Sequence, residues 1–164
     1  MKITDKYVFF WNGIYSQWYS CNFEVDGEEY TSAEQYMMHQ KALLFNDYAI
    51  AQKILETNNP SEQKGLGRRI SNFNKDIWDK NSLKIVIKGN LAKFSQNPYL
   101  LKQLLATENR IFCEASPYDY IWGVGLHEDD ERILNPINWE GLNLLGQVLT
   151  IVRNELNERN KNNN

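Results

Sequence analysis

The chain has 164 residues, 42% of them hydrophobic and 13% aromatic, which favours one globular domain and excludes disordered, collagen-like and coiled-coil proteins. Two isolated cysteines and two histidines form no metal-ligand pattern, and no apolar run approaches the roughly 20 residues that cross a bilayer. The net charge is -3, but the middle third is basic, with a net charge of +6 over residues 61–110. This indicates either solvated helix faces or a positively charged surface that binds a phosphorylated substrate. We therefore expect a soluble, unprocessed, cytoplasmic protein without metal or cofactor.

The first 30 residues have the pattern of short strands. Residues 7–10 form an apolar run, and residues 22–30 contain Asp26-Gly27, a dipeptide typical of two-residue hairpin turns. Between these segments, residues 11–19 mix aromatic and polar side chains, which suits a loop lining a cleft.

From Ser32 onward the pattern changes to helical. Ser32 followed by Gln35 fits a capping box, Asn46 or Asp47 can cap the next helix, and Asn59-Pro60 starts a short one that Gly65 and Gly67 should stop. A long helix with Gly89 near its middle follows, then another opened by Asn97-Pro98. The predicted helices of this part cover residues 33–45, 47–58, a short stretch from 60, 75–95 and 98–107.

The C-terminal part returns to mixed structure. Residues 110–115 alternate as a short strand, and residues 142–158 carry apolar side chains at helical spacing, which indicates a core stripe. Residues 158–164 are predicted to be a disordered polar tail. The expected fold is therefore α+β, a mainly helical single domain over residues 1–157 with a small mixed β-sheet.

One candidate site lies on the first predicted helix. Glu34, Met38 and Lys41 fall on one face, with the two charged residues about 10.5 Å apart along the axis, too far for a routine surface ion pair. The helix start also favours an anion. The simpler interpretation is that Glu34 complements the helix dipole and Lys41 is solvated.

A second candidate segment runs from Glu114 to Gly123. Pro117 interrupts the strand, and Asp119 sits where the chain turns, so Asp119 as a former of an Asx turn is the simpler interpretation. Two carboxylates, Trp122 and a glycine would also suit cleavage of a glycosidic bond, because an oxocarbenium-like transition state needs nearby negative charge and a positioned water. The sequence contains no complete motif for acyl transfer, for a nucleotide phosphate loop or for dinucleotide binding.

Several motifs follow one another in a fixed order along the chain: Thr31–Tyr36 with Gln40–Ala42, Leu66–Arg68 with Trp78, Lys93–Asn97, Glu114–Ser116 with Asp119, Ile121–Leu126, Trp139–Gly146 and Arg153. This ordered set resembles the NADAR (YbiA-like) family over about residues 7–156. The departures are Gln17, where the family's aromatic loop often has Asn, and Val124, where some members have an acid.

The resemblance implies an N-glycosidase that hydrolyses a bond between ribose C1′ and nitrogen. Its substrate would be an ADP-ribosylated guanine in nucleic acid or a phosphoribosyl intermediate of riboflavin synthesis. Glu34, Trp78 and Asp119 would be catalytic, with Glu34 preferred for orienting or deprotonating water and Asp119 for holding ribose hydroxyls or stabilising the cationic sugar, roles that can be exchanged. The implied substrate-binding residues are Trp18, Tyr36, Lys41, Gly67, Arg68, Glu114, Trp122, Gly123 and Asn143, with Lys41 and Arg68 on phosphate.

Two other interpretations stay open at this point. A catalytically silent module would bind ADP-ribose or NAD-related nucleotides without product release. A purely structural interaction protein would leave Glu34 and Lys41 exposed and unpaired. The sequence does not indicate an oligomeric state.

Overall fold

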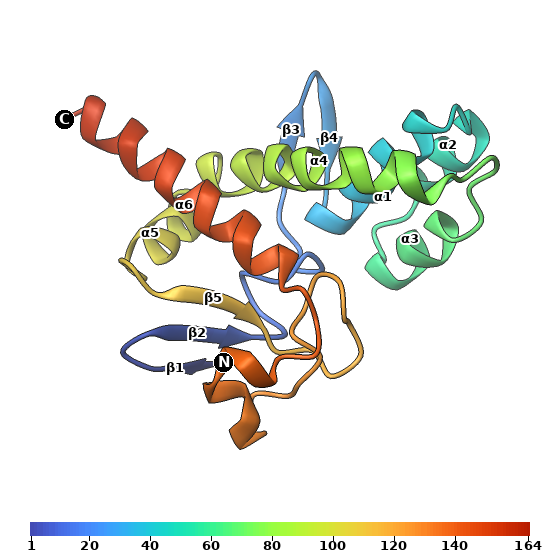
Figure 1. Ribbon diagram of the computed structural model, residues 1–164. Helices are drawn as coiled ribbons and strands as arrows, with labels where there is room; N and C mark the ends of the chain where they lie inside the picture. Colours follow the sequence, from blue (N-terminus) through green and yellow to red (C-terminus); the bar gives the residue numbers. More distant parts are fainter. The chain divides into compact units, whose positions relative to one another are not determined.

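The computed structural model describes residues 1–164, and the chain divides into two compact units. The first combines residues 1–16 with 98–164, and the second comprises residues 17–97. The chain thus begins in one unit, builds the other without interruption, and returns (Figure 1).

The first unit is built on a three-stranded mixed sheet. β2 (Tyr7–Phe10) is its middle strand, antiparallel to β1 (Lys2–Ile3) and parallel to β5 (Ile111–Glu114). Val8, Phe9 and Phe10 have no exposed surface, as expected for an uninterrupted apolar run covered on both faces. The predicted strands and the small mixed sheet are confirmed.

Two α-helices belong to this unit, α5 (Pro98–Leu105) and α6 (Leu144–Asn162), with the 3₁₀ turns η1 (Glu131–Leu134) and η2 (Pro136–Asn138). α6 packs on β5. Its predicted apolar stripe is buried at Leu145, Val148, Leu149, Val152 and Leu156.

The C-terminal end of α6 differs from the expected disordered tail over residues 158–164. The helix continues to Asn162, and ion pairs join Arg159 to Glu155 at 3.0 Å and Lys161 to Glu158 at 3.6 Å. Such pairs, three or four residues apart, each stabilise an exposed helix by a few tenths of a kcal/mol, which supports helix where the polar composition alone indicates coil.

The second unit contains a β-hairpin and four helices. β3 (Phe23–Val25) and β4 (Glu28–Tyr30) pair antiparallel, and Asp26 and Gly27 adopt φ of 53° and 85° between them, which confirms the predicted turn. The helices are α1 (Ala33–Leu44), α2 (Tyr48–Glu56), α3 (Pro60–Gly67) and α4 (Lys75–Ser95).

Side-chain caps set the starts of these four helices. Ser32, Asp47, Asn59 and Asn74 each accept a hydrogen bond from a backbone N–H of the first turn. α1 is the central helix, because α2, α3 and α4 all pack against it. None of the helices in either unit combines the length and apolar character needed to span a membrane.

The end of α3 corrects one expectation. Gly65 does not stop the helix, which continues to Gly67 with Arg68 as its C-cap. Glycine inside a helix costs about 1 kcal/mol relative to alanine. Here the fully buried Gln63 accepts from Ser32 Oγ and donates to the Thr57 carbonyl, and these bonds hold α3 in place through Gly65.

Lys93 on α4 gives a testable pH dependence. Its side chain has no exposed surface, and burial lowers its pKa to about 8, against an opposing effect of Cys21. Below pH 8 the amine is charged in both the folded and the unfolded protein, so folding bears the whole free-energy cost of burying a charge. Between about pH 8 and its unfolded pKa of 10.5 the unfolded chain holds more protons, so the free energy of unfolding rises with pH.

We expect Lys93→Met to remove this rise. Both proteins carry Cys21→Ala, which removes the nearby thiol, and are unfolded in urea at pH 7.5 to 10. Over this range the free energy of unfolding of the protein with Lys93 should rise by at most about 3 kcal/mol relative to that of the protein with Met at this position. A difference between the two proteins that stays constant over this pH range would contradict the assignment.

Candidate functional site

Glu34 lies in the first turn of α1 and is only 6% exposed. Its backbone N–H donates to the Gln17 carbonyl at 2.9 Å, so the segment at Gln17 and Trp18 lies against the start of the helix. The positive end of the helix dipole favours the ionised carboxylate at this position. Complementing the helix dipole is the simpler sequence interpretation of Glu34, whereas its burial differs from the exposed Glu34 that a purely structural interaction protein would have.

Lys41 lies two turns further along α1 and connects it to α3. Its ammonium donates to the Gly67 carbonyl at 3.2 Å and lies 4.7 Å from the ring centre of Phe73 and 5.5 Å from that of Trp78. The side chain is half-buried, and it is fixed by these contacts rather than solvated.

Two neighbouring charges shift the pKa of Lys41. Burial lowers the pKa of Lys41, the Glu34 carboxylate raises it, and the Arg68 guanidinium lowers it further. The structure therefore brings together four of the predicted residues, Glu34, Lys41, Arg68 and Trp78, at the junction of α1, α3 and α4.

Gly67 belongs to the same junction through close packing. A Cβ at this position would overlap the Met38 thioether, so a larger residue would require the Met38 side chain to move. Met38, which shares the helix face with Glu34 and Lys41, is 6% exposed and is used for this packing.

Trp18 and Lys64 form a further pair of an aromatic ring and a cation in this unit. Trp18 is 45% exposed, and the Lys64 ammonium lies 6.0 Å from its ring centre. Sequence reasoning missed Lys64 and Phe73. Helical spacing could not pair Lys64 with Arg68, because the predicted helix stops at Gly65 or Gly67.

Tyr36 differs from the other predicted substrate-binding residues. It is 2% exposed and packs with Phe23, Val25 and Tyr30, its ring meeting that of Tyr30 edge to face at 5.1 Å. The ring is enclosed by the core because residue 36 faces the hairpin and α4, where a Cβ on Gly89 would overlap it. Packing explains this residue without a role in binding.

In the first unit, Asp119 organises the loop after β5. Its Oδ1 accepts from the backbone N–H groups of Ile121 and Trp122 at 3.0 and 2.8 Å, the Asx turn that the simpler interpretation predicts. Both hydrogen bonds of the turn use Oδ1, and neither uses Oδ2. Gly123 follows, and a Cβ there would crowd the backbone carbonyls of Asp119 and Glu114.

Asn143 connects this loop to the sheet and to α6. It is 5% exposed and left-handed at φ 52°, and its side chain accepts from the Glu114 N–H at 3.1 Å and donates to the Phe112 carbonyl at 2.9 Å. Its own N–H donates to the Gly123 carbonyl at 3.0 Å. The structure thus places Glu114, Asp119, Trp122 and Gly123 in one segment of the first unit and connects Asn143 to that segment by hydrogen bonds.

Comparison with known proteins matches residues 9–157 to the NADAR domain. The chain belongs to the NADAR family. It is 49% identical to an N-glycosidase of Acanthamoeba polyphaga mimivirus over 93% of this chain and 97% of that protein. It is 28% identical to a riboflavin biosynthesis protein of Vibrio vulnificus over 96% of this chain and 40% of that protein. The solved structure of E. coli protein YbiA matches with a TM-score of 0.79 and 25% identity, covering 97% of this chain and 89% of that one.

These findings confirm the family and the α+β fold expected from the motifs. Because a NADAR relative similar along its whole length is an N-glycosidase, they support a glycosidase enzyme. The assignment rests on the match over residues 9–157 and on these relatives rather than on any single residue.

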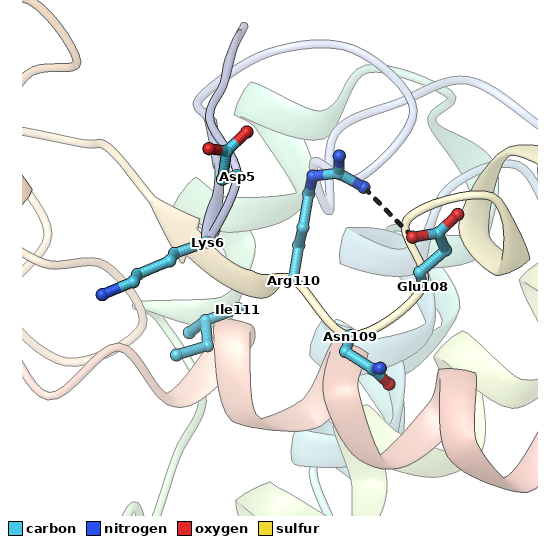
Figure 2. Close-up of a pocket in the computed structure, with 6 residues that line it drawn as sticks. All are labelled: Asp5, Lys6, Glu108, Asn109, Arg110 and Ile111. Atoms are coloured by element: carbon cyan, nitrogen blue, oxygen red, sulfur yellow. Dashed lines mark ion pairs between the residues drawn. The ribbon is translucent and has the colours of Figure 1, made fainter.

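A pocket of about 370 Å³ in the first unit of this NADAR protein holds none of the predicted site residues (Figure 2). Arg110 lines it, with Nε donating to the Thr4 carbonyl at 2.8 Å and a guanidinium nitrogen 4.0 Å from the Glu108 carboxylate. Its charged groups are of both signs, and the bonds of Arg110 connect the turn before β2 to the start of β5. The lining residues are Asp5, Lys6, Glu108, Asn109, Arg110 and Ile111.

Proposed function

We propose that this NADAR protein hydrolyses the N-glycosidic bond between ribose C1′ and a guanine nitrogen, releasing ADP-ribose from a modified base in nucleic acid. The observation that supports the proposal is the junction of α1, α3 and α4. There Glu34 is buried, and its carboxylate raises the pKa of Lys41 while the Arg68 guanidinium lowers it. The Lys41 ammonium lies 4.7 Å and 5.5 Å from the ring centres of Phe73 and Trp78.

The proposed reaction uses these groups as follows. Water attacks C1′ and loses a proton to Glu34, while the C1′–N bond breaks and the base leaves with its electron pair and takes up a proton. Negative charge stabilises the cationic sugar in the transition state. Lys41 and Arg68 bind phosphate as cations, and the indole of Trp78 offers a flat surface to the base or ribose.

Asp119 is assigned to the same reaction by its place in the NADAR motif order, holding ribose hydroxyls or stabilising the cationic sugar. Its Oδ1 is used by the Asx turn, so the proposed contact is made by Oδ2. The rigid turn would fix the direction of that second oxygen.

A second candidate substrate is a phosphoribosyl N-glycoside of riboflavin synthesis. It is favoured by the Vibrio vulnificus relative, whose name refers to that biosynthesis. The chemistry at C1′ is the same, so the alternatives differ in the leaving base and in what is attached to the ribose 5′-oxygen.

Parallel incubations test the proposal. Pure protein is given an oligonucleotide with ADP-ribosylated guanine and, separately, a phosphorylated ribosylaminouracil, and mass spectrometry resolves the released base and sugar. We expect ADP-ribose from the oligonucleotide. Cleavage of the small intermediate alone would assign the protein to the second candidate, and binding of ADP-ribose without turnover of either would indicate a silent module.

A further inference from the structure

Asn90 is a fully buried amide on α4 to which the proposed reaction gives no part. Its Nδ2 donates to the Val86 carbonyl, one turn back on α4, and to Gln17 Oε1, both at 2.9 Å. The second bond joins residues that are 73 positions apart in the chain. Asn90 thus connects the long helix α4 to the segment of Gln17 and Trp18, which lies against the start of α1.

This connection leaves a buried acceptor without a partner. No group of the protein donates to Asn90 Oδ1, and Gln17 Nε2 donates to the Met37 thioether at 3.9 Å, where sulfur is a weak acceptor. The simpler explanation is that the two amides satisfy each other inside the core. Apolar side chains of similar shape would fill the same space without the cost of an unsatisfied acceptor. The bond is therefore better explained by what it holds in place.

Gln17 lies between two candidate residues of the site. Its backbone carbonyl accepts the Glu34 N–H at 2.9 Å, and this N–H belongs to the first turn of α1, where the helix itself offers no acceptor. Trp18 follows directly and is 45% exposed, whereas the Gln17 side chain is buried. A shift of the Gln17 backbone would therefore act on Glu34 and on the indole of Trp18 together.

We propose that Gln17 and Asn90 are positioning residues, because the bond between their side chains fixes the Gln17 backbone and, through it, the direction of the Glu34 carboxylate. The role of Glu34 in the reaction rests on the proposed function, which the inference deepens. The length of residue 17 matters for this bond. Asparagine, which the NADAR aromatic loop often has here, is one methylene shorter and would end short of Asn90 from the same backbone position.

An exchange of side-chain lengths tests the inference. Gln17→Asn shortens one partner, and combining it with Asn90→Gln restores both the total length and the pair of amides. A misplacement of about 1 Å can cost about a hundredfold in rate, but the Ser32 cap still holds α1, so we expect Gln17→Asn to lower kcat for release of ADP-ribose about tenfold. The double variant should return to within about threefold of the wild type.

Amide hydrogen exchange, followed by NMR, reports on the same bond without a substrate. The Glu34 N–H should exchange about tenfold faster in Gln17→Asn and return to the wild-type rate in the double variant. The Gln35 N–H is the internal reference, because it donates to Ser32 Oγ at 3.0 Å in the same helical turn and does not depend on Gln17. Its rate should stay unchanged.

The matched control is Asn97→Ala. Asn97 Nδ2 donates to the Lys93 carbonyl at 2.7 Å and to the Asn22 carbonyl at 3.1 Å, so it also joins a carbonyl four residues back to a distant segment, but it does not contact Gln17. This variant should leave kcat and the ratio of the two exchange rates unchanged.

The outcomes separate this inference from the proposed function. Equal acceleration at Glu34 and Gln35 would show a general loss of stability and overturn the inference. An unchanged Glu34 rate or an unchanged kcat in Gln17→Asn would do the same, as would a double variant that stays impaired. If the wild type cleaves neither substrate, the proposed function falls, but a Glu34 rate that rises and is then restored still assigns the placement of Glu34 to Gln17 and Asn90.

Discussion

Replacing Glu34 by glutamine is expected to lower kcat by about a thousandfold while the protein stays folded. Glutamine keeps the size and the polar atoms of the side chain, but it cannot accept a proton from water or stabilise a cationic sugar by charge. General base catalysis alone contributes 10²–10⁴-fold in enzymes. Single-turnover release of ADP-ribose from the modified oligonucleotide measures the effect.

A matched variant separates catalysis from the helix dipole. Asp76→Asn removes an acid from the first turn of α4, where it is exposed, just as Glu34→Gln removes one from the first turn of α1. Loss of the dipole interaction costs each helix about 0.3–1 kcal/mol. We expect both variants to lose stability in that range and only Glu34→Gln to lose activity. Undiminished turnover by Glu34→Gln would remove this carboxylate from the mechanism.

The parts of the fold that sequence reasoning predicts well are those decided by local chemistry. The hairpin at Asp26 and Gly27 needs only two residues that tolerate positive φ, and the starts of α1, α2 and α3 need only a side-chain oxygen at the cap. The helix bounds follow, and α4 covers residues 75–95 as predicted. The ordered motifs of the NADAR family then supply the fold.

Features decided by packing are not visible in the sequence. Gly65 stays helical because distant residues hold Gln63, and Tyr36 is a core residue because its face of α1 meets the hairpin. Likewise, helical spacing places Glu34 and Lys41 on one face but does not show that Lys41 bonds to a carbonyl of α3. Sequence reasoning thus supplies candidate residues for the site, whereas their partners depend on the tertiary structure.

Asn143→Ala is expected to lower the free energy of unfolding by about 3 kcal/mol. The substitution leaves the Glu114 N–H and the Phe112 carbonyl without their partner, and a buried unsatisfied group costs about 1–3 kcal/mol. Alanine also fits the left-handed backbone at φ 52° less well than asparagine does. Urea unfolding followed by circular dichroism measures the loss.

Two further variants separate the side-chain contribution from the backbone contribution at this position. Asn143→Gly loses the same two hydrogen bonds but tolerates the left-handed conformation, so it should be about 1 kcal/mol more stable than Asn143→Ala. Asn138→Ala removes an exposed asparagine with one side-chain bond, at 3.3 Å to the Arg132 carbonyl, and should cost less than 1 kcal/mol. If Asn143→Ala costs no more than Asn138→Ala, then Asn143 does not hold the loop of Asp119 and Gly123 against β5. The Asx turn alone would then have to fix the direction of the Asp119 carboxylate.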